Sequence, residues 1–251
     1  MDTMALAHRA KQTNERKYAE VLVREFGRPG PPRDRQFALA RAPFRAFVTL
    51  NYDPLLRKSL EITSTRGKGV TIYVYPHLPV CHLGDPGQCE MDLPQHALYH
   101  IHGRINHDTT VPEVVLTPQE YHKAYDSTLL PSFLTQLLAY FPTCFLGCSL
   151  SEDAMLRSII SLCKRIQKDL AQMSPHPRPK WYMLIDRDEF SCQNVNLDEY
   201  GITPVLFNKT NKEFEGLDQI LKEWAGMQPA TESVPFEGTA DIYMPDQEPS
   251  R

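Results

Sequence analysis

The sequence predicts an α/β fold in which a mostly parallel sheet is flanked by helices. Short β-rich runs alternate with helical patterns between about residues 45 and 226, which is typical of layered α/β proteins. The 251 residues are 41% hydrophobic and 23% charged, a composition that supports a substantial core. No stretch approaches the roughly 20 consecutive apolar residues that a membrane span requires. The chain is therefore expected to be globular.

The expected strands are short runs rich in β-branched and aromatic residues, bounded by polar or turn-forming residues. They comprise Arg45–Leu50, Val70–Tyr75, Ala97–His102, Glu113–Leu116, Thr143–Leu146, Lys180–Ile185 and Thr203–Phe207.

The expected helices lie between these strands. They comprise Pro54–Leu60, Pro118–Tyr125, Pro131–Tyr140, Glu152–Leu170 and Glu213–Ala225. The helix over 152–170 has the strongest pattern, since its apolar residues recur at three- and four-residue spacing after an acidic first turn.

Charge and proline content divide the chain into three parts. Residues 1–44 are expected to form a helical N-terminal segment, and residues 45–226 to form the α/β domain. Residues 227–251 hold four prolines and five acidic residues with little apolar material, so they are expected to form a disordered acidic tail. For the basic first 27 residues, a solvated helix is favoured over a contact surface.

The net charge and the cysteine content limit the binding partners and the cellular compartment that can be expected for this chain. The net charge of −4 offers no general attraction for nucleic acid or anionic lipid. The polar N-terminus has no apolar signal core, and six cysteines without a C-x-x-C pair are too sparse for a disulfide scaffold, so a cytoplasmic location is expected. The scattered residues His77, Cys81, His82, Cys89 and His96 match no regular zinc spacing, so no metal is expected.

Polar residues follow three of the expected strands, where ligands bind in open α/β sheets. Asn51 and Asp53 follow the first strand; they could face a cleft, or they could end the strand and cap the next helix. Two histidines, His100 and His102, precede Gly103, and their spacing places them on one face of the expected strand. They could supply a base, a half-buried polar face or metal ligands.

The third position is the run Gly147-Cys148-Ser149-Leu150, which joins a strand to a helix. Backbone N–H groups at such a junction suit a phosphate or a ribose. A tight turn with a serine cap explains the same residues.

Together, the ordered motifs Asn-Tyr-Asp, His-Gly and Gly-x-Ser-Leu-x-x-Asp resemble the sirtuin-like domain family, in the branch found in bacterial antiphage defence proteins that cleave NAD. The run Val114–Thr117 leading to Tyr121, and the run Leu197–Ile202, are also similar to the family. The resemblance covers about residues 45–225 and implies a Rossmann-like fold.

By position, the resemblance implies site residues. Asn51 matches the asparagine that holds a water or the nicotinamide ribose, Asp53 the acidic residue that orients the nicotinamide end, and His102 the catalytic histidine. Gly103, which directly follows that histidine, belongs to the implied NAD site, and Gly147, Ser149 and Leu150 match the turn at the adenine-side ribose.

The sequence departs from the family in one respect. The glycine-rich loop that cradles the pyrophosphate, and the strand before it, have no counterpart, since only Gly27 and Gly30 in Gly-Arg-Pro-Gly-Pro-Pro precede Asn51. The expected function is NAD hydrolysis with NAD as the substrate. The alternatives are an impaired module that binds a nucleotide or a protein partner, and a deacylase, which the absence of a four-cysteine zinc module disfavours. A protein partner or a homo-oligomer is left open.

Overall fold

A computed structural model describes residues 3–64, 69–79, 93–109, 113–147, 154–173, 179–192, 196–209 and 214–227. Within these ranges the helices are α1 (Thr3–Thr13), α2 (Glu15–Leu22), α3 (Asp34–Arg41), α4 (Leu55–Thr63), α5 (Pro118–Tyr125), α6 (Leu129–Tyr140), α7 (Ala154–Met173), α8 (Arg187–Cys192) and α9 (Glu215–Gly226). A π-helical turn (Val23–Gly27) continues α2, and a 3₁₀ turn (Leu197–Tyr200) precedes the last strand. The strands are β1 (Ala46–Thr49), β2 (Ile72–Val74), β3 (Ala97–His100), β4 (Thr143–Phe145), β5 (Trp181–Asp186) and β6 (Ile202–Phe207).

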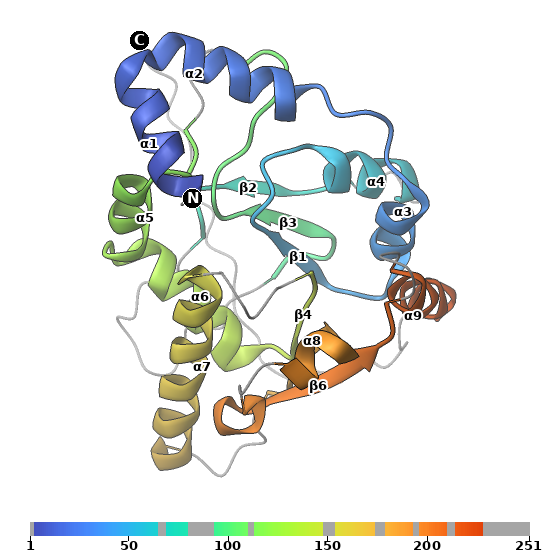
Figure 1. Cartoon of the computed structure of the whole chain (residues 1–251). Coiled ribbons are helices and arrows are strands. Elements are labelled where there is room, and N and C mark those ends of the chain that lie inside the picture. The colour runs from blue at the N-terminus through green and yellow to red at the C-terminus, as the bar shows by residue number, and fades with distance from the viewer. Residues whose placement is uncertain are drawn as a thin grey trace, which may run out of the picture.

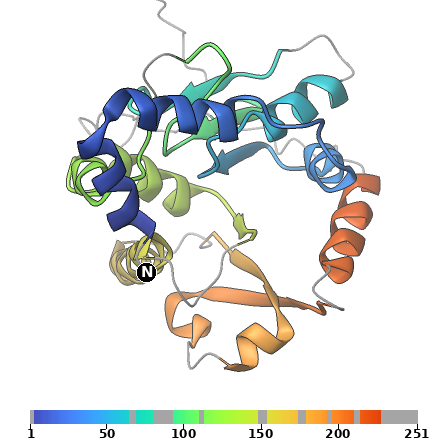
Figure 2. The same cartoon turned by 45° about the horizontal axis from the view of Figure 1, so that its top comes forward.

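The strands form two three-stranded sheets rather than one, in the orders β1–β3–β2 and β4–β5–β6. Every pairing in both sheets is parallel. The α/β class and the parallel sheet with flanking helices are therefore confirmed (Figure 1). β1 and β4 are each an outer strand of their sheet, and the sheet is interrupted between them (Figure 2).

Two predicted strands are corrected. Residues 113–116 form no strand, because Val115 makes only a local pair of bonds: its N–H donates to the His102 carbonyl and its carbonyl accepts from the Tyr52 hydroxyl. The strand predicted over 97–102 ends at His100, since Ile101 and His102 form a turn. Helix α3 lies within the N-terminal segment that was expected to be helical, whereas α8, which spans only six residues, was not predicted.

One helical layer packs on the face of both sheets that carries Tyr99 of β3 and Trp181 of β5. Helix α6 spans the interruption: the ring of Phe133 lies 5.1 Å from that of Tyr99, while the Leu138 carbonyl accepts a hydrogen bond from Trp181 Nε1 at 3.0 Å. A single buried cluster therefore joins the two sheets on this face.

Helix α3 spans the interruption on the opposite face. Its residue Ala40 is buried with Phe47 of β1 and Leu98 of β3, while Ala38 is buried with Leu184 of β5. Figure 1 shows α3, α4 and α9 on this side of the sheets and α6 and α7 on the other. An ion pair from Arg35 of α3 to Asp218 of α9, with a second contact at 2.9 Å, holds the same layer together.

The N-terminal segment is not a solvated helix, contrary to the favoured expectation. Leu22 of α2 is buried with Ile105 and Val114, and the Phe26 ring lies edge-on to Tyr52 at 5.6 Å. A Cβ on Gly27 would lie 2.8 Å from the Asn106 carbonyl oxygen, so the chain approaches this loop closely. The segment therefore covers the loop that follows Gly103.

None of the helices in the described ranges is long and apolar enough to cross a membrane. The tail predicted to be disordered lies, from residue 228 onward, outside the described residues.

Candidate functional site

Backbone and side-chain hydrogen bonds join three separate segments at the carboxyl ends of β1 and β3. The Ile101 N–H donates to the Thr49 carbonyl at 3.1 Å, and the Ile105 N–H donates to the Tyr52 carbonyl at 2.9 Å. The Tyr52 hydroxyl donates to the Val115 carbonyl at 2.8 Å. Residues 49–53, 100–105 and 113–116 therefore form one connected unit, and it lies where open α/β sheets bind ligands.

Asn51 and Asp53 leave β1 in a turn at this edge. The Asn51 side chain is exposed, and its backbone carbonyl accepts a hydrogen bond from His100 Nδ1 at 3.1 Å. Asp53 Oδ1 accepts from the Leu55 N–H at 2.9 Å, so it caps the first turn of α4. Capping is one of the two roles that the sequence offers for Asp53, and its second carboxylate oxygen is left for other contacts.

His100 is fully buried and held in one tautomer. Because a carbonyl can only accept, Nδ1 must carry the proton that is donated to Asn51. Burial lowers the pKa of His100 to about 4, so the ring is neutral near pH 7 and Nε2 is a bare acceptor. Among the described residues nothing donates a hydrogen bond to Nε2, which leaves a buried acceptor without a partner beside Asn51.

His102 lies in an aromatic pocket formed by helix α5. Its Nε2 is 2.9 Å from the Tyr125 hydroxyl, and its ring lies edge-on to Tyr121 with the ring centres 5.1 Å apart. The residue is only 2% exposed, and this burial lowers its pKa to about 4. His102 is therefore a neutral base at pH 7, but α5 covers it.

The two histidines do not share one face, contrary to the prediction from their spacing. The strand ends at His100, so the two-residue alternation does not reach His102. His100 contacts the Asn51 turn, whereas His102 contacts α5.

Gly103 is required by its backbone and by its surroundings. Its φ is +87°, and a Cβ would lie 2.1 Å from the Glu113 carbonyl oxygen. Gly147 has a φ of +68° at the end of β4, but a Cβ there would meet nothing within 4 Å. Ser149 and Leu150 lie outside the described residues, and no described contact joins Gly147 to Asn51 or His102.

Tyr125 and Arg104 also lie at the site, although no sequence motif singled them out. Tyr125 could have been found from the sequence. The run Thr117-Pro118-x-Glu120 is a capping box that predicts the start of a helix, and Tyr125 lies four residues after Tyr121 on the same face of that helix. Arg104 directly follows Gly103, and its pKa is lowered by burial and by the neighbouring Arg57. Asp108 and Glu61 act on this pKa in the opposite direction, and Arg57 pairs with Glu61 at 2.7 Å, so Arg104 lies among charges of both signs.

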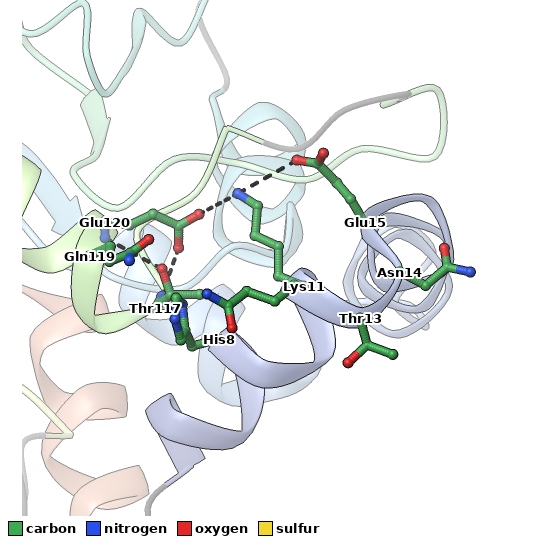
Figure 3. A pocket seen from close by; sticks show the side chains of 9 residues that line it. His8, Lys11, Thr13, Asn14, Glu15, Thr117, Gln119 and Glu120 are labelled. Carbon is green, nitrogen blue, oxygen red and sulfur yellow. Dashed lines mark hydrogen bonds and ion pairs between the residues drawn. The ribbon is translucent and has the colours of Figure 1, made fainter.

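A hollow of about 370 Å³ lies between α1 and α5, apart from these residues (Figure 3). Lys11 of α1 reaches across it to Glu120 of α5 at 2.8 Å, and Glu120 in turn accepts from the Leu116 and Thr117 N–H groups. Although burial opposes it, these bonds hold the pKa of Glu120 below its usual value. The contact fixes the first turn of the helix that covers His102.

The structure gives no support for a metal centre within the described ranges, where no three His, Cys, Asp or Glu side chains gather as ligands. Cys81, His82 and Cys89 lie outside those ranges.

Comparison of the sequence with models of known protein families finds a match, and that match includes the segments of the candidate site. A family model for the SIR2-like domain matches residues 45–205, which include the turn at Asn51, the His102-Gly103 pair and Gly147. No curated protein matches the chain. SIR2-like domains use NAD. Because the match covers more than half of the 251 residues, the chain belongs to the SIR2-like domain family.

Proposed function

We propose that this domain hydrolyses NAD, releasing nicotinamide. The observation that carries the proposal is the connected unit at the carboxyl ends of β1 and β3, in which hydrogen bonds hold the Asn51 turn against the His102-Gly103 turn. The family match, which ties the domain to NAD, covers both turns. A role in antiviral defence rests on the resemblance of the motifs alone.

The unpartnered acceptor on His100 supports a ligand at this place. A buried acceptor without a donor is rare in native proteins, and it is commonly explained by a bound group or a water. The carboxamide of nicotinamide and the hydroxyls of ribose are donors of the right kind. The exposed amide of Asn51 and the free oxygen of Asp53 supply further polar contacts to the same ligand.

Each residue has a role in the proposed reaction. Cleavage of the bond between nicotinamide and ribose develops positive charge on the ribose, while nicotinamide leaves as a neutral molecule. Asn51 and Asp53 position the nicotinamide end. Water supplies the oxygen that bonds to the ribose carbon, and His102 accepts the proton, a contribution typically worth about 10²–10⁴ in rate.

The burial of His102 adds a requirement to this mechanism. In the structure, Tyr125 occupies Nε2 and Tyr121 covers the ring. Substrate therefore reaches the base only after α5 shifts away from it. The low pKa of His102 suits a base that must be unprotonated near neutral pH.

The test is the release of nicotinamide from NAD by the purified chain and by variants of it. His102→Ala is expected to lose turnover by at least about a hundredfold. The matched control is His122→Ala, because His122 is on the same helix as Tyr125 with its side chain 80% exposed. Turnover that is equal in both variants contradicts the assignment of His102.

A second function is favoured by the covered base and the interrupted sheet. On this alternative the domain is catalytically impaired and binds a nucleotide or a partner protein as a regulatory or assembly module. NAD binding without nicotinamide release, unchanged by His102→Ala, would identify that case.

A further inference from the structure

The cover over His102 depends on the first turn of α5. Tyr125 lies 2.9 Å from His102 Nε2, and the ring of Tyr121 lies edge-on to the same imidazole. The Tyr121 N–H donates to the Thr117 carbonyl at 3.0 Å, so the position of Tyr121 follows from the start of the helix. A contact that holds this first turn in place therefore helps to keep His102 covered.

The first turn of α5 is held from outside by Lys11 of α1. Lys11 Nζ lies 2.8 Å from Glu120 Oε1, and only 34% of the lysine side chain and 20% of the glutamate side chain are exposed (Figure 3). Glu120 Oε2 meanwhile accepts from the Thr117 N–H at 2.7 Å. Because the two carboxylate oxygens have different partners, loss of the lysine contact leaves the capping box in place.

Helix α1 is loosely packed. None of its residues 4–13 is buried, and Leu6 is 45% exposed. The hollow of about 370 Å³ lies between α1 and α5, so the two helices are not packed closely along their contact. Elements with few buried contacts open locally at a lower free-energy cost than the core.

Helix α2, in contrast, is anchored. Its residues Ala19 and Leu22 are buried, and Leu22 packs with Ile105 and Val114. A single residue, Asn14, separates α1 from α2, and its backbone is extended. Figure 1 shows that the chain changes direction there, with α1 turned toward α5. Rotation at this one residue therefore moves α1 away from α5 while α2 stays in place.

We propose that α1 holds α5 closed over His102, and that detachment of α1 uncovers this base. When the contact between Lys11 and Glu120 breaks, the first turn of α5 is freed, and the tyrosines that cover His102 move with the helix. The change in access to His102 rests on these contacts alone, whereas its effect on turnover rests on the proposed NAD hydrolysis.

The experiment measures how fast diethyl pyrocarbonate modifies His102 in the whole chain, with the modified residues assigned by tandem mass spectrometry. This reagent attacks neutral imidazole. At about pH 7.5 a histidine is mostly neutral whether it is covered or not, so the rate reports access to the ring. His122 is the internal reference, because its side chain is 80% exposed on the same helix.

Charge-removing variants locate the contact. Lys11→Met keeps most of the side-chain stem, and it is expected to raise the rate of modification of His102 relative to His122 by about threefold or more. Lys17→Met, at an exposed lysine of α2, is the matched control and is expected to leave this ratio unchanged.

Glu120→Gln removes the other charge of the pair. Because glutamine also completes a capping box, the start of α5 is retained, and an increase similar to that of Lys11→Met is expected. The double variant Lys11→Met/Glu120→Gln is expected to show no further increase, since both substitutions remove the same contact.

Salt gives the same test without altering the protein. Raising the ionic strength from about 0.05 M to about 0.5 M screens the ion pair, so it is expected to raise the ratio in the wild type but not in Lys11→Met. The proposal is overturned if Lys11→Met leaves the ratio unchanged, if Lys17→Met raises it equally, or if the effects of Lys11→Met and Glu120→Gln add in the double variant.

Nicotinamide release in the same samples tests the proposed function separately. Faster modification of His102 in Lys11→Met without any release of nicotinamide supports the role of α1 and contradicts NAD hydrolysis. Release of nicotinamide with an unchanged rate of modification supports NAD hydrolysis and overturns the role of α1.

Discussion

Two buried histidines make the stability of the domain depend on pH. Burial lowers the pKa of both His100 and His102 to about 4, whereas the ordinary value is 6.5. Between these values the unfolded chain binds more protons than the folded chain. The free energy of unfolding is therefore highest above pH 6.5 and falls as the pH drops toward 4.

Urea unfolding at pH 7.5 and pH 5 measures this loss, which is at most about 2 kcal/mol per histidine between these two pH values. His100→Gln and His102→Gln are each expected to flatten the pH dependence. His122→Gln, at a side chain that is 80% exposed, is expected to leave it unchanged. A wild-type stability that is constant over this range would show that neither ring is held neutral by the fold.

Two glycines with similar backbone angles provide a matched pair of substitutions. Gly103→Ala is expected to destabilise the protein by about 2–4 kcal/mol, because the new Cβ meets the Glu113 carbonyl as well as straining the backbone. Gly147→Ala is expected to cost only about 1–2 kcal/mol of unfolding free energy from backbone strain, since no atom lies within 4 Å of the new Cβ. Equal losses in urea unfolding would contradict the close approach at Gly103.

At the scale of single elements, α5 is fixed at both ends. Its first turn has a capping box, in which Thr117 Oγ1 accepts from the Glu120 N–H and Glu120 accepts from the Thr117 N–H. Its last turn holds Tyr125 against His102. The helix that covers the candidate base is therefore anchored by contacts that substitution can remove one at a time.

Thr117→Ala is expected to cost about 1 kcal/mol of unfolding free energy through loss of the cap. Thr128, which precedes α6, provides the control because its side chain makes no capping hydrogen bond. Thr128→Ala should therefore change the urea midpoint little, and a loss as large as that of Thr117→Ala would rule out capping as the cause.

Tyr125→Phe leaves the buried Nε2 of His102 without its partner, so a loss of about 1–3 kcal/mol is expected. Tyr140→Phe, at a residue that is 56% exposed, is the control. Thermal unfolding of the two variants side by side measures the difference, and an unchanged midpoint for Tyr125→Phe would mean that the hydroxyl contact contributes nothing.

At the scale of the whole molecule, the sequence predicted the class of fold but not the division of the sheet. Strands such as Trp181–Asp186 and the helix Pro118–Tyr125 follow from local apolar runs and caps, and the structure has them close to their predicted bounds. The interruption between β1 and β4 depends on long-range packing through α3 and α6, for which local patterns carry no signal.

The same distinction applies to the candidate site. Asn51, Asp53 and His102 can be selected from motifs because each follows a predicted strand. That His100 turns toward Asn51 while His102 turns toward α5 follows from the end of β3 at His100, a boundary that periodicity does not fix. Their roles in turnover remain predictions.

The most direct test of a functional SIR2-like site is the binding of NAD to the folded chain, measured by titration calorimetry. We expect NAD to bind, and we expect Asn51→Ala to weaken binding by about tenfold or more, because it removes the exposed amide beside the unpartnered acceptor of His100. The control is Asn196→Ala, at an exposed asparagine directly before the 3₁₀ turn that leads into β6. A folded chain that does not bind NAD, or that binds it equally with and without the Asn51 side chain, would contradict a functional NAD site at the carboxyl ends of β1 and β3.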